Sequence, residues 1–114
     1  MTRYEAGDVV LVRLPFTDLS SSKLRPALIV STPRFQSRQG DVVVLALTSQ
    51  RQREDALRLV EWRSAGLPKP SWLKPVIGTL AASLILRCLG KLNVKDDVVV
   101  RSTLAQLLST KYLR

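Results

Sequence analysis

Short apolar runs alternate with polar, turn-forming stretches along most of the chain, and each run has the length of a strand. DVVLVRL at residues 8–14 follows the turn signal Ala-Gly-Asp, and RPALIVS at residues 25–31 forms a second run. VVVLALT at residues 42–48 is apolar on both faces, as is typical of a central strand. Residues 56–62 and 72–79 have strand-like content on either side of RSAGLPKPS, with its turn-forming glycine and prolines. We therefore expect five strands.

Helical spacing replaces the strand pattern near the end of the chain. Apolar side chains recur there on one helical face, at Val100, Leu104, Leu107 and Leu108. Asn93 is a preferred helix-capping residue, and Asp96 follows it in the capping-box position. We predict one amphipathic C-terminal helix that closes a small, strongly bent sheet or barrel, an α+β fold that is mainly β.

The length of 114 residues fits a single domain spanning residues 1–114. Lys and Arg number 18 against 9 Asp and Glu, which gives a formal net charge of +9. Such a surface attracts polyanions, a class that includes nucleic acids, acidic proteins and anionic lipid headgroups. The first residues lack the apolar run and cleavage site of a signal peptide, and no apolar stretch approaches the roughly 20 residues that cross a bilayer. We expect a cytoplasmic protein without a membrane partner.

The chain contains no histidine, which excludes an imidazole base, the commonest metal ligand and any Ser-His or Cys-His pair. No carboxylate cluster has the spacing of metal ligands, and no glycine-rich loop resembles a phosphate cradle. We therefore expect neither a metal nor another cofactor. The single cysteine, Cys88, stands in the apolar context LILRCLGKL and is expected to be a packed thiol.

Two polar positions stand where predicted strands meet predicted loops. PFTDLSSSKL, residues 15–24, is a polar connection long enough to form a functional surface loop, and it ends directly at Arg25. In the run at residues 42–48, a period of two places Thr48 at the polar end of an otherwise apolar row. A ligand held at that end would meet the Thr48 hydroxyl.

Four segments carry an ordered pattern of strands, loops and a helix. In GDVVLVRLPFTDLSSSKLRPALIVS, a strand and a loop precede Arg-Pro, a hydrophobic strand and Ser. VVVLALTSQ is a third strand that ends in Thr-Ser, AGLPKPSWLKP is a middle segment, and LGKLNVKDDVVVRSTLAQLL is a terminal helix preceded by Gly-x-Leu. In this order and spacing the segments resemble the MazF/PemK family of type II toxin–antitoxin toxins, over nearly the whole chain.

The resemblance implies an SH3-like small barrel of five to seven strands, a homodimer with RNA running across its interface, and metal-independent, sequence-specific cleavage of single-stranded mRNA. It also implies a cognate antitoxin, which we expect to be acidic. In the family, the Arg of the Arg-Pro pair and the Thr that ends the third strand are the central catalytic residues, here Arg25 and Thr48. Attack of a ribose 2′-OH on its own phosphate builds negative charge on the non-bridging oxygens, which a guanidinium stabilises. Thr48 would donate a hydrogen bond to that phosphate or fix the attacking 2′-OH.

The chain departs from the family pattern at the positions that transfer protons. Where some members carry an Arg and an Asp, this chain has Leu73 and Pro75 with Lys74 between them, and its first loop contains no histidine. Asp18 is the one carboxylate of that loop. It is either the base that accepts the 2′-OH proton or a turn-forming residue.

Further positions are candidates for holding the RNA, and each has a plain structural alternative. An aromatic stacks on a base or packs on the core, a serine contacts phosphate or belongs to a flexible linker, and a cation holds the RNA backbone or is merely solvated. These candidates are Phe16, Asp18, Ser21, Lys23, Ser49, Arg51 and Lys74.

Two classes of function follow. The first is an active endoribonuclease. The second is a catalytically weak or inactive module of the same fold that binds nucleic acid or protein, for example a topoisomerase-inhibiting relative or an RNA-binding barrel. The missing acid and histidine favour the second class, and the pairing of Arg25 with Thr48 favours the first.

Overall fold

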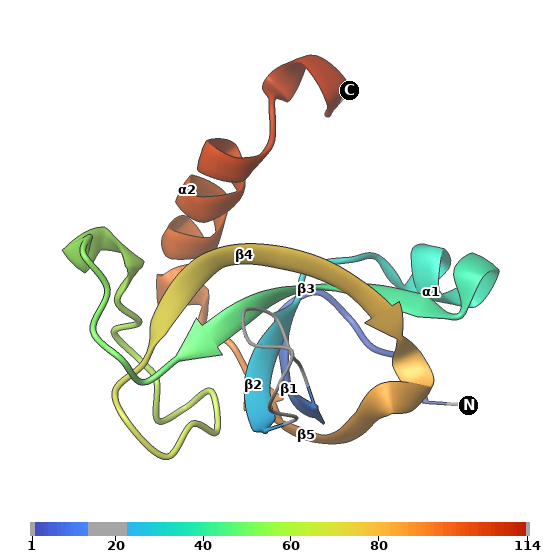
Figure 1. Ribbon diagram of the computed structural model, residues 1–114, viewed down its shortest axis with the longest axis horizontal. Coiled ribbons are helices and arrows are strands. Elements are labelled where there is room, and N and C mark those ends of the chain that lie inside the picture. Colours follow the sequence, from blue (N-terminus) through green and yellow to red (C-terminus); the bar gives the residue numbers. More distant parts are fainter. Residues whose placement is uncertain (1, 14–22, 114) are drawn as a thin grey trace.

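Five antiparallel strands form one sheet in the part of the chain that the computed structural model describes, residues 2–13 and 23–113 (Figure 1). They are β1 (Asp8–Arg13), β2 (Leu24–Ile29), β3 (Asp41–Thr48), β4 (Trp72–Ala81) and β5 (Ile85–Lys91). Their order is β4-β3-β2-β1-β5, so β3 lies inside the sheet, as its apolar sequence predicts. Figure 1 shows β4 arching over the other strands while β5 passes beneath them, which bends the sheet toward a barrel.

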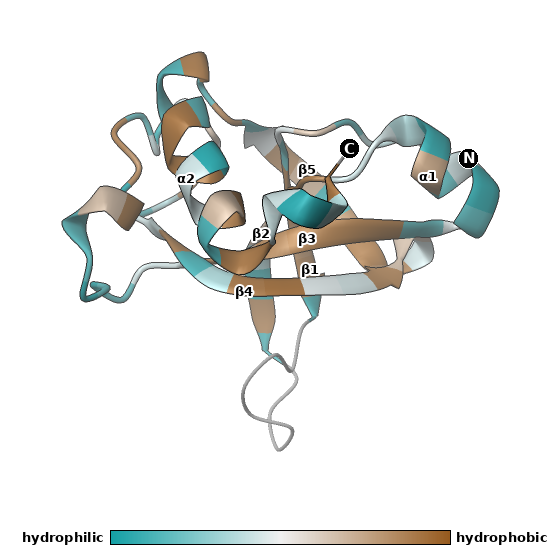
Figure 2. Ribbon diagram, turned by 90° about the horizontal axis from the view of Figure 1, so that it is seen from above, coloured by the Kyte–Doolittle hydropathy of each residue, from teal (hydrophilic) through white to brown (hydrophobic). Residues whose placement is uncertain are grey.

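Apolar side chains cover both faces of the bent sheet, and β3 contributes to both. The cluster on the face away from the C-terminal helix comprises Tyr4, Val10, Val12, Ala27, Ile29, Val42, Val44 and Ile85. The cluster under that helix comprises Val9, Leu28, Leu45, Leu47, Leu57, Leu59, Ala65, Leu67, Leu73, Leu92 and Val99. Figure 2 shows the hydrophobic residues concentrated along the strands, with hydrophilic residues on α1 and the loops.

One short helix, α1 (Pro33–Gln39), connects β2 to β3 and was not predicted from the sequence. The Thr32 hydroxyl accepts a hydrogen bond from the Phe35 N–H at 3.1 Å, which caps its first turn. Gly40 ends the helix in the left-handed conformation, at a φ of 73°. A helix of 7 residues is too short for its apolar period to be visible, although the Thr-Pro start and the Gly end are readable helix signals.

The C-terminal helix α2 (Asp97–Leu107) confirms the predicted amphipathic helix, but its start differs from the predicted capping box. Its partly buried face packs on the core through Val100, Leu104 and Leu107. Asp96 does not turn back toward Asn93: its buried carboxylate accepts hydrogen bonds from the N–H groups of Val60 and Glu61, at 2.8 and 2.9 Å. A charged group so far from water requires such donors, and these two bonds satisfy it. None of the described helices is long and apolar enough to cross a membrane.

The prediction of a strand at residues 56–62 is wrong. That segment begins as a short 3₁₀ turn and then makes a single isolated bridge between Arg58 and Trp72. Its apolar content reflects the burial of Leu57 and Leu59 in the core without strand pairing. The fifth strand is instead β5, which pairs with β1. The 3₁₀ turns are η1 (Asp55–Leu57), η2 (Ala82–Leu84), η3 (Val94–Asp96) and η4 (Thr110–Tyr112).

The expectation for Cys88 is also wrong, because its thiol is exposed. Cys88 lies on β5, the edge strand beside β1, and its neighbour Leu86 is 56% exposed. In this strand the run of residues 86–88 is exposed although two of the three are apolar or weakly polar, so the apolar context did not indicate burial.

The loop of residues 59–71 returns across the end of the sheet and packs backbone to backbone on β5. Gly66 has a φ of +82°, and a Cβ atom there would collide with the Leu89 carbonyl. A Cβ atom at Gly90 would lie 2.6 Å from the Ala65 carbonyl oxygen. Only glycine fits at both positions, so these two residues determine where the 59–71 loop packs against β5.

Substitution of Gly66 tests this close approach. We expect Gly66→Ala to lower the free energy of unfolding by roughly 3 kcal/mol or more, because left-handed strain adds to overpacking. Gly40→Ala is the matched control: its φ is also positive, at +73°, but no atom lies within 4 Å of the added Cβ. It should cost only about 1 to 2 kcal/mol. Equal losses in urea denaturation would contradict the close packing of the loop on β5.

Candidate functional site

The register of β2 and β3 carries Arg25 and Thr48 to the same end of the sheet. In the β2–β3 ladder Ala27 lies opposite Ala46 and Leu28 opposite Leu45. The ladder ends at Ala27 and Ala46; Arg25 precedes Ala27 by two residues and Thr48 follows Ala46 by two, so both lie beyond the same end of the ladder. The two positions are 23 residues apart in the chain, and both lie at one end of the β2–β3 pair.

Arg25 and Thr48 line a cavity of about 370 Å³, which we name the Arg25 pocket. Strands supply one side of it and the 59–71 loop supplies the other. The lining consists of Leu11, Leu24, Arg25, Pro26, Leu47, Thr48, Ser49, Gly66, Leu67, Pro68, Lys69, Ser71, Arg87 and Leu89. Apolar walls with a few polar groups are typical of a ligand site.

The polar lining of the Arg25 pocket is cationic or neutral. Arg25, Lys69 and Arg87 contribute positive charges, and the described lining contains no carboxylate. None of these three cations makes an ion pair with another described residue. Uncompensated positive charge over an apolar floor concentrates anions, so the pocket suits a phosphate-bearing ligand.

Thr48 presents an oriented hydroxyl to the pocket. Its Oγ1 accepts a hydrogen bond from the Gln50 N–H at 3.1 Å. That bond occupies a lone pair of the hydroxyl oxygen and leaves its proton available for donation. Trp72 lies opposite Thr48 in the β3–β4 ladder, and the Arg58 guanidinium stands 5.9 Å from its ring centroid. The end of β3 is therefore a hydrogen-bond donor with an aromatic neighbour.

Comparison with known proteins identifies the family. The family model described as PemK-like, MazF-like toxin of type II toxin–antitoxin system matches residues 5–108. The chain belongs to this family. No curated protein matches the sequence.

Solved structures agree with this fold. MazF from Deinococcus radiodurans is 20% identical, with 96% of this chain and 100% of that chain covered and a TM-score of 0.73. An endoribonuclease from a mycobacterial species is 24% identical, with 94% and 92% covered and a TM-score of 0.71. A mycobacterial endoribonuclease in complex with its cognate antitoxin is 22% identical, with 94% of each chain covered and a TM-score of 0.70. These similarities confirm the predicted MazF-like fold, which is mainly β and carries a C-terminal helix.

Of the residues proposed from the sequence, the structure gathers Arg25, Thr48 and Ser49 around the pocket. Lys23 is exposed immediately before β2, close to the pocket in sequence but not in its lining. Arg51 is exposed and forms an ion pair with Asp55 at 3.6 Å, outside the lining.

Lys74 lies on β4 opposite Ala46 and does not line the pocket. The candidates Phe16, Asp18 and Ser21 fall outside the described residues.

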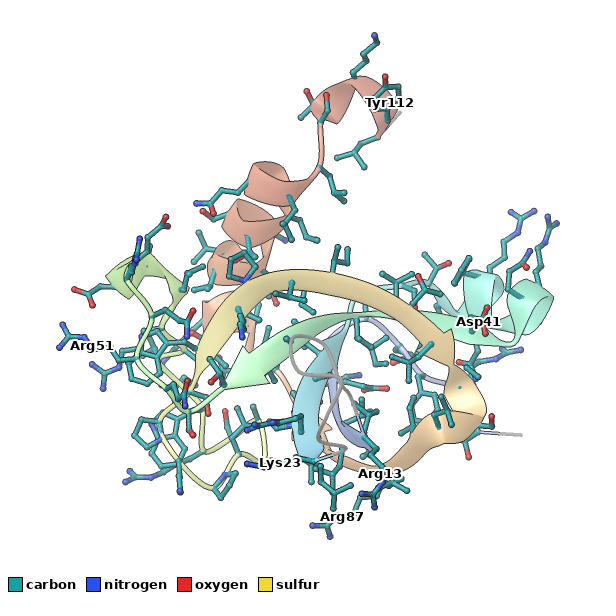
Figure 3. All side chains as sticks on the ribbon, viewed as in Figure 1. Arg13, Lys23, Asp41, Arg51, Arg87 and Tyr112 are labelled. Atoms are coloured by element: carbon teal, nitrogen blue, oxygen red, sulfur yellow. The ribbon has the colours of Figure 1, made fainter. Side chains whose placement is uncertain are left out.

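Sequence reasoning missed two cations of the Arg25 pocket, Lys69 and Arg87. Arg87 lies on β5, opposite Leu11 of β1, in a strand that was not predicted. An arginine inside the apolar run LILRCLGKL was the available signal. Figure 3 shows the side chains of Arg13, Lys23 and Arg87 at the same end of the molecule, so positive charge extends beyond the pocket.

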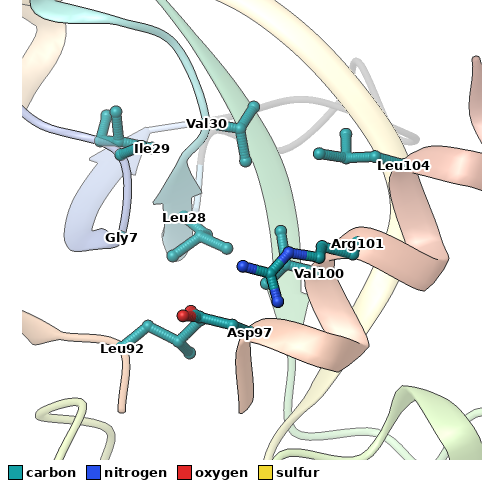
Figure 4. Close-up of a pocket in the computed structure, with 10 residues that line it drawn as sticks. Gly7, Leu28, Ile29, Val30, Leu92, Asp97, Val100, Arg101 and Leu104 are labelled. Carbon is teal, nitrogen blue, oxygen red and sulfur yellow. The ribbon is translucent and has the colours of Figure 1, made fainter. Parts of the chain in front are cut away.

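A second cavity, of about 290 Å³, lies between α2 and the end of β2 (Figure 4). Its lining is mostly apolar, and its charged residues, Asp97 and Arg101, have opposite signs and stand one turn apart on α2. It contains no hydroxyl side chain. This cavity lacks the positive field and the donor set of the Arg25 pocket.

Two groups with shifted pKa values lie away from the Arg25 pocket. Burial is the main cause that raises the pKa of the Tyr4 phenol above its ordinary value. A hydrogen bond from the Lys91 ammonium to Glu5, at 3.1 Å, raises the pKa of that lysine. Both shifts belong to the fold around the first strand, since neither residue lines the pocket.

Inorganic phosphate should bind the Arg25 pocket and stabilise the fold. At ten times its Kd, we expect phosphate to add roughly 1.4 kcal/mol to the free energy of unfolding relative to chloride at equal ionic strength. The Arg25→Gln/Arg87→Gln double variant should lose this gain. Arg34→Gln/Arg38→Gln on α1 removes the same charge outside the lining and should keep it. Equal gains in thermal unfolding of both variants would show that the anion binds elsewhere.

Proposed function

We propose that this toxin is an endoribonuclease that cuts single-stranded RNA at the Arg25 pocket, without a metal ion, by attack of a ribose 2′-OH on the adjacent phosphate. The observation that carries the proposal is that Arg25 and Thr48 line the same cationic pocket, which has no described carboxylate. The family and the relatives named endoribonucleases support the same enzymatic class.

Five polar residues of the pocket have a task in this reaction. The Arg25 guanidinium donates hydrogen bonds to the non-bridging phosphate oxygens and stabilises the charge that develops on them. The free hydroxyl proton of Thr48 is donated to the same phosphate or orients the 2′-OH. Arg87 and Lys69 add positive charge along the RNA backbone, and Ser49 adds a neutral donor.

The bond changes define the products. The 2′-OH loses its proton, an O2′–P bond forms, and the P–O5′ bond breaks as the leaving oxygen gains a proton. The products are a 2′,3′-cyclic phosphate and a 5′-OH end. DNA lacks the 2′-OH and therefore remains intact. Asp18 is our candidate for the base that removes the 2′-OH proton, since it is the one carboxylate of the loop before Arg25.

We also propose a homodimer, selectivity for an RNA sequence, and an acidic cognate antitoxin that covers the basic surface. The net charge of +9 favours an acidic partner, and related structures include toxins in complex with their antitoxins.

A second candidate function is RNA binding without cutting. It is favoured by the absence of a carboxylate from the described lining and of histidine from the chain, which leaves proton transfer to a single candidate outside that lining.

RNA cleavage in EDTA separates the two functions. We expect purified protein to convert single-stranded RNA into fragments that end in 2′,3′-cyclic phosphate, and Arg25→Ala or Thr48→Val to slow this by about 10²- to 10³-fold, as for a lost oxyanion donor. Arg101→Ala removes one charge on α2, outside the pocket, and should cut normally. Bound but intact RNA would support the binding module instead.

Expression in bacteria tests the toxin role. The wild-type chain should arrest growth, whereas Arg25→Ala should not, because the transition state loses its main cation. Normal circular dichroism and an unchanged elution volume of the variant provide the control for folding and assembly. Undiminished growth arrest by Arg25→Ala would remove this residue from its role.

A further inference from the structure

The 59–71 loop forms the side of the Arg25 pocket that the strands do not supply. It carries the ammonium of Lys69 to the pocket, and the buried Ser71 hydroxyl holds the loop by donating a hydrogen bond to the Lys69 carbonyl at 2.8 Å. The ends of the loop are joined by a hydrogen bond from the Leu59 N–H to the Ser71 carbonyl at 2.9 Å. Its tip is fixed by the contact of Gly66 with β5. The backbone that follows Leu59 is anchored in a different way.

Asp96 holds that backbone from the start of α2. Its side chain is fully buried, and its two oxygens accept hydrogen bonds from the Val60 and Glu61 N–H groups, at 2.8 and 2.9 Å. These contacts join positions 36 and 35 residues apart in the chain. A buried carboxylate is tolerated only when its lone pairs are satisfied, so the two amides must stay where Asp96 holds them.

The helix itself does not require this carboxylate. Asn93 caps the turn before α2 through a hydrogen bond from the Lys95 N–H at 2.9 Å, and Asp96 makes no side-chain capping bond to α2. Burial of Leu59, Ala65 and Leu67 holds other parts of the loop, but the Val60 side chain is 71% exposed. At residues 60 and 61 the polar contacts include the two bonds of Asp96 and an ion pair of Glu61 with Lys95 at 3.7 Å. The two bonds of Asp96 therefore act on the loop.

We propose that Asp96 is a positioning residue for substrate binding, because it helps to fix the 59–71 loop and so places Lys69 against the RNA bound at Arg25. This inference rests on the proposed endoribonuclease function. Arg25 and Thr48 stand on the paired strands β2 and β3, whereas the two side-chain hydrogen bonds of Asp96 go to the loop, so its loss weakens RNA binding and leaves the chemical step intact.

Asp96→Asn is the test, because the amide keeps the shape of the carboxylate but replaces one acceptor with a donor that faces a backbone N–H. The probe is a fluorescein-labelled, mixed-sequence RNA with 2′-O-methyl ribose throughout, which cannot be cut. We expect its Kd to rise about tenfold, which is the effect of losing one charge-assisted hydrogen bond. For cleavable RNA, KM should rise by the same factor with kcat unchanged. Hydrogen exchange at Val60 and Glu61 should accelerate.

A matched control separates positioning from general destabilisation. Thr103 is also buried on α2, and its hydroxyl donates to the Val99 carbonyl at 2.7 Å. Thr103→Val removes this buried bond without touching the loop and should leave Kd and KM unchanged. A variant that is merely less stable lowers the active fraction, which reduces the apparent kcat and leaves KM as it was.

Coupling to Lys69 gives a second, independent measurement. Lys69 is exposed, so Lys69→Gln should fold normally and raise Kd. If Asp96 acts through the loop, the double variant should bind RNA no more weakly than the weaker single variant. Where Asp96→Asn does not fold, Asp96→Glu takes its place, since it keeps the charge but displaces the two acceptors by one methylene.

Each outcome decides a separate question. Additive losses, or an unchanged Kd with faster exchange at residues 60 and 61, would overturn the positioning role while the proposed function stands. Failure of the wild-type chain to bind or cut RNA would overturn the proposed function and the inference with it. Equal rises of Kd in Asp96→Asn and Thr103→Val would show that loss of stability alone explains the effect.

Discussion

Gly66 and Gly90 bring the backbones of the 59–71 loop and β5 closer together than any side chain would allow. The core under α2 and the Arg25 pocket both depend on that contact. It closes the 59–71 loop onto β5, which carries Ala65 and Leu67 into the core beneath α2. The same closure turns the end of the sheet into a pocket. The same loop thus completes both the core and the pocket, because moving it away from β5 would expose buried apolar surface to water.

Burial in the middle of β2 and β3 also determines which residues lie at the ends of these strands. Ala27, Ile29 and Val44 are fully buried, so a shift of one residue in the β2–β3 register would turn them toward the opposite face. That penalty holds β2 and β3 in the register whose one end leads to the pocket lined by Arg25 and Thr48. Neither residue needs a strong contact with the other. Their positions depend on apolar residues that do not themselves line the pocket.

The elements that could be predicted from the sequence are those whose signal lies in a continuous stretch. The four strands β1 to β4 and helix α2 have apolar patterns that match their burial, and Arg25 and Thr48 stand at the ends of such patterns. Residues 56–62 misled the prediction because Leu57 and Leu59 are buried without strand pairing. In such a case an apolar pattern indicates burial and leaves the backbone conformation undetermined.

Contacts that join distant segments were beyond the reach of local patterns. Arg87 joins the pocket only through the pairing of β5 with β1, and Lys69 only through closure of the 59–71 loop. Asp96 was expected to serve its own helix and serves a loop 35 and 36 residues away. In each case the residue is visible in the sequence, but the distant segment that it contacts could not be predicted from a local pattern.

The two tryptophans give the protein an internal optical probe of this region. Trp62 lies in the 59–71 loop, under the Arg63 guanidinium at 4.7 Å, and Trp72 follows the loop and pairs with Thr48. The Trp72 indole nitrogen is buried and finds no acceptor among the described residues. The intrinsic tryptophan fluorescence of this chain therefore comes only from the 59–71 loop and the adjoining end of the sheet, so it is a local signal from this region and does not average over the whole fold.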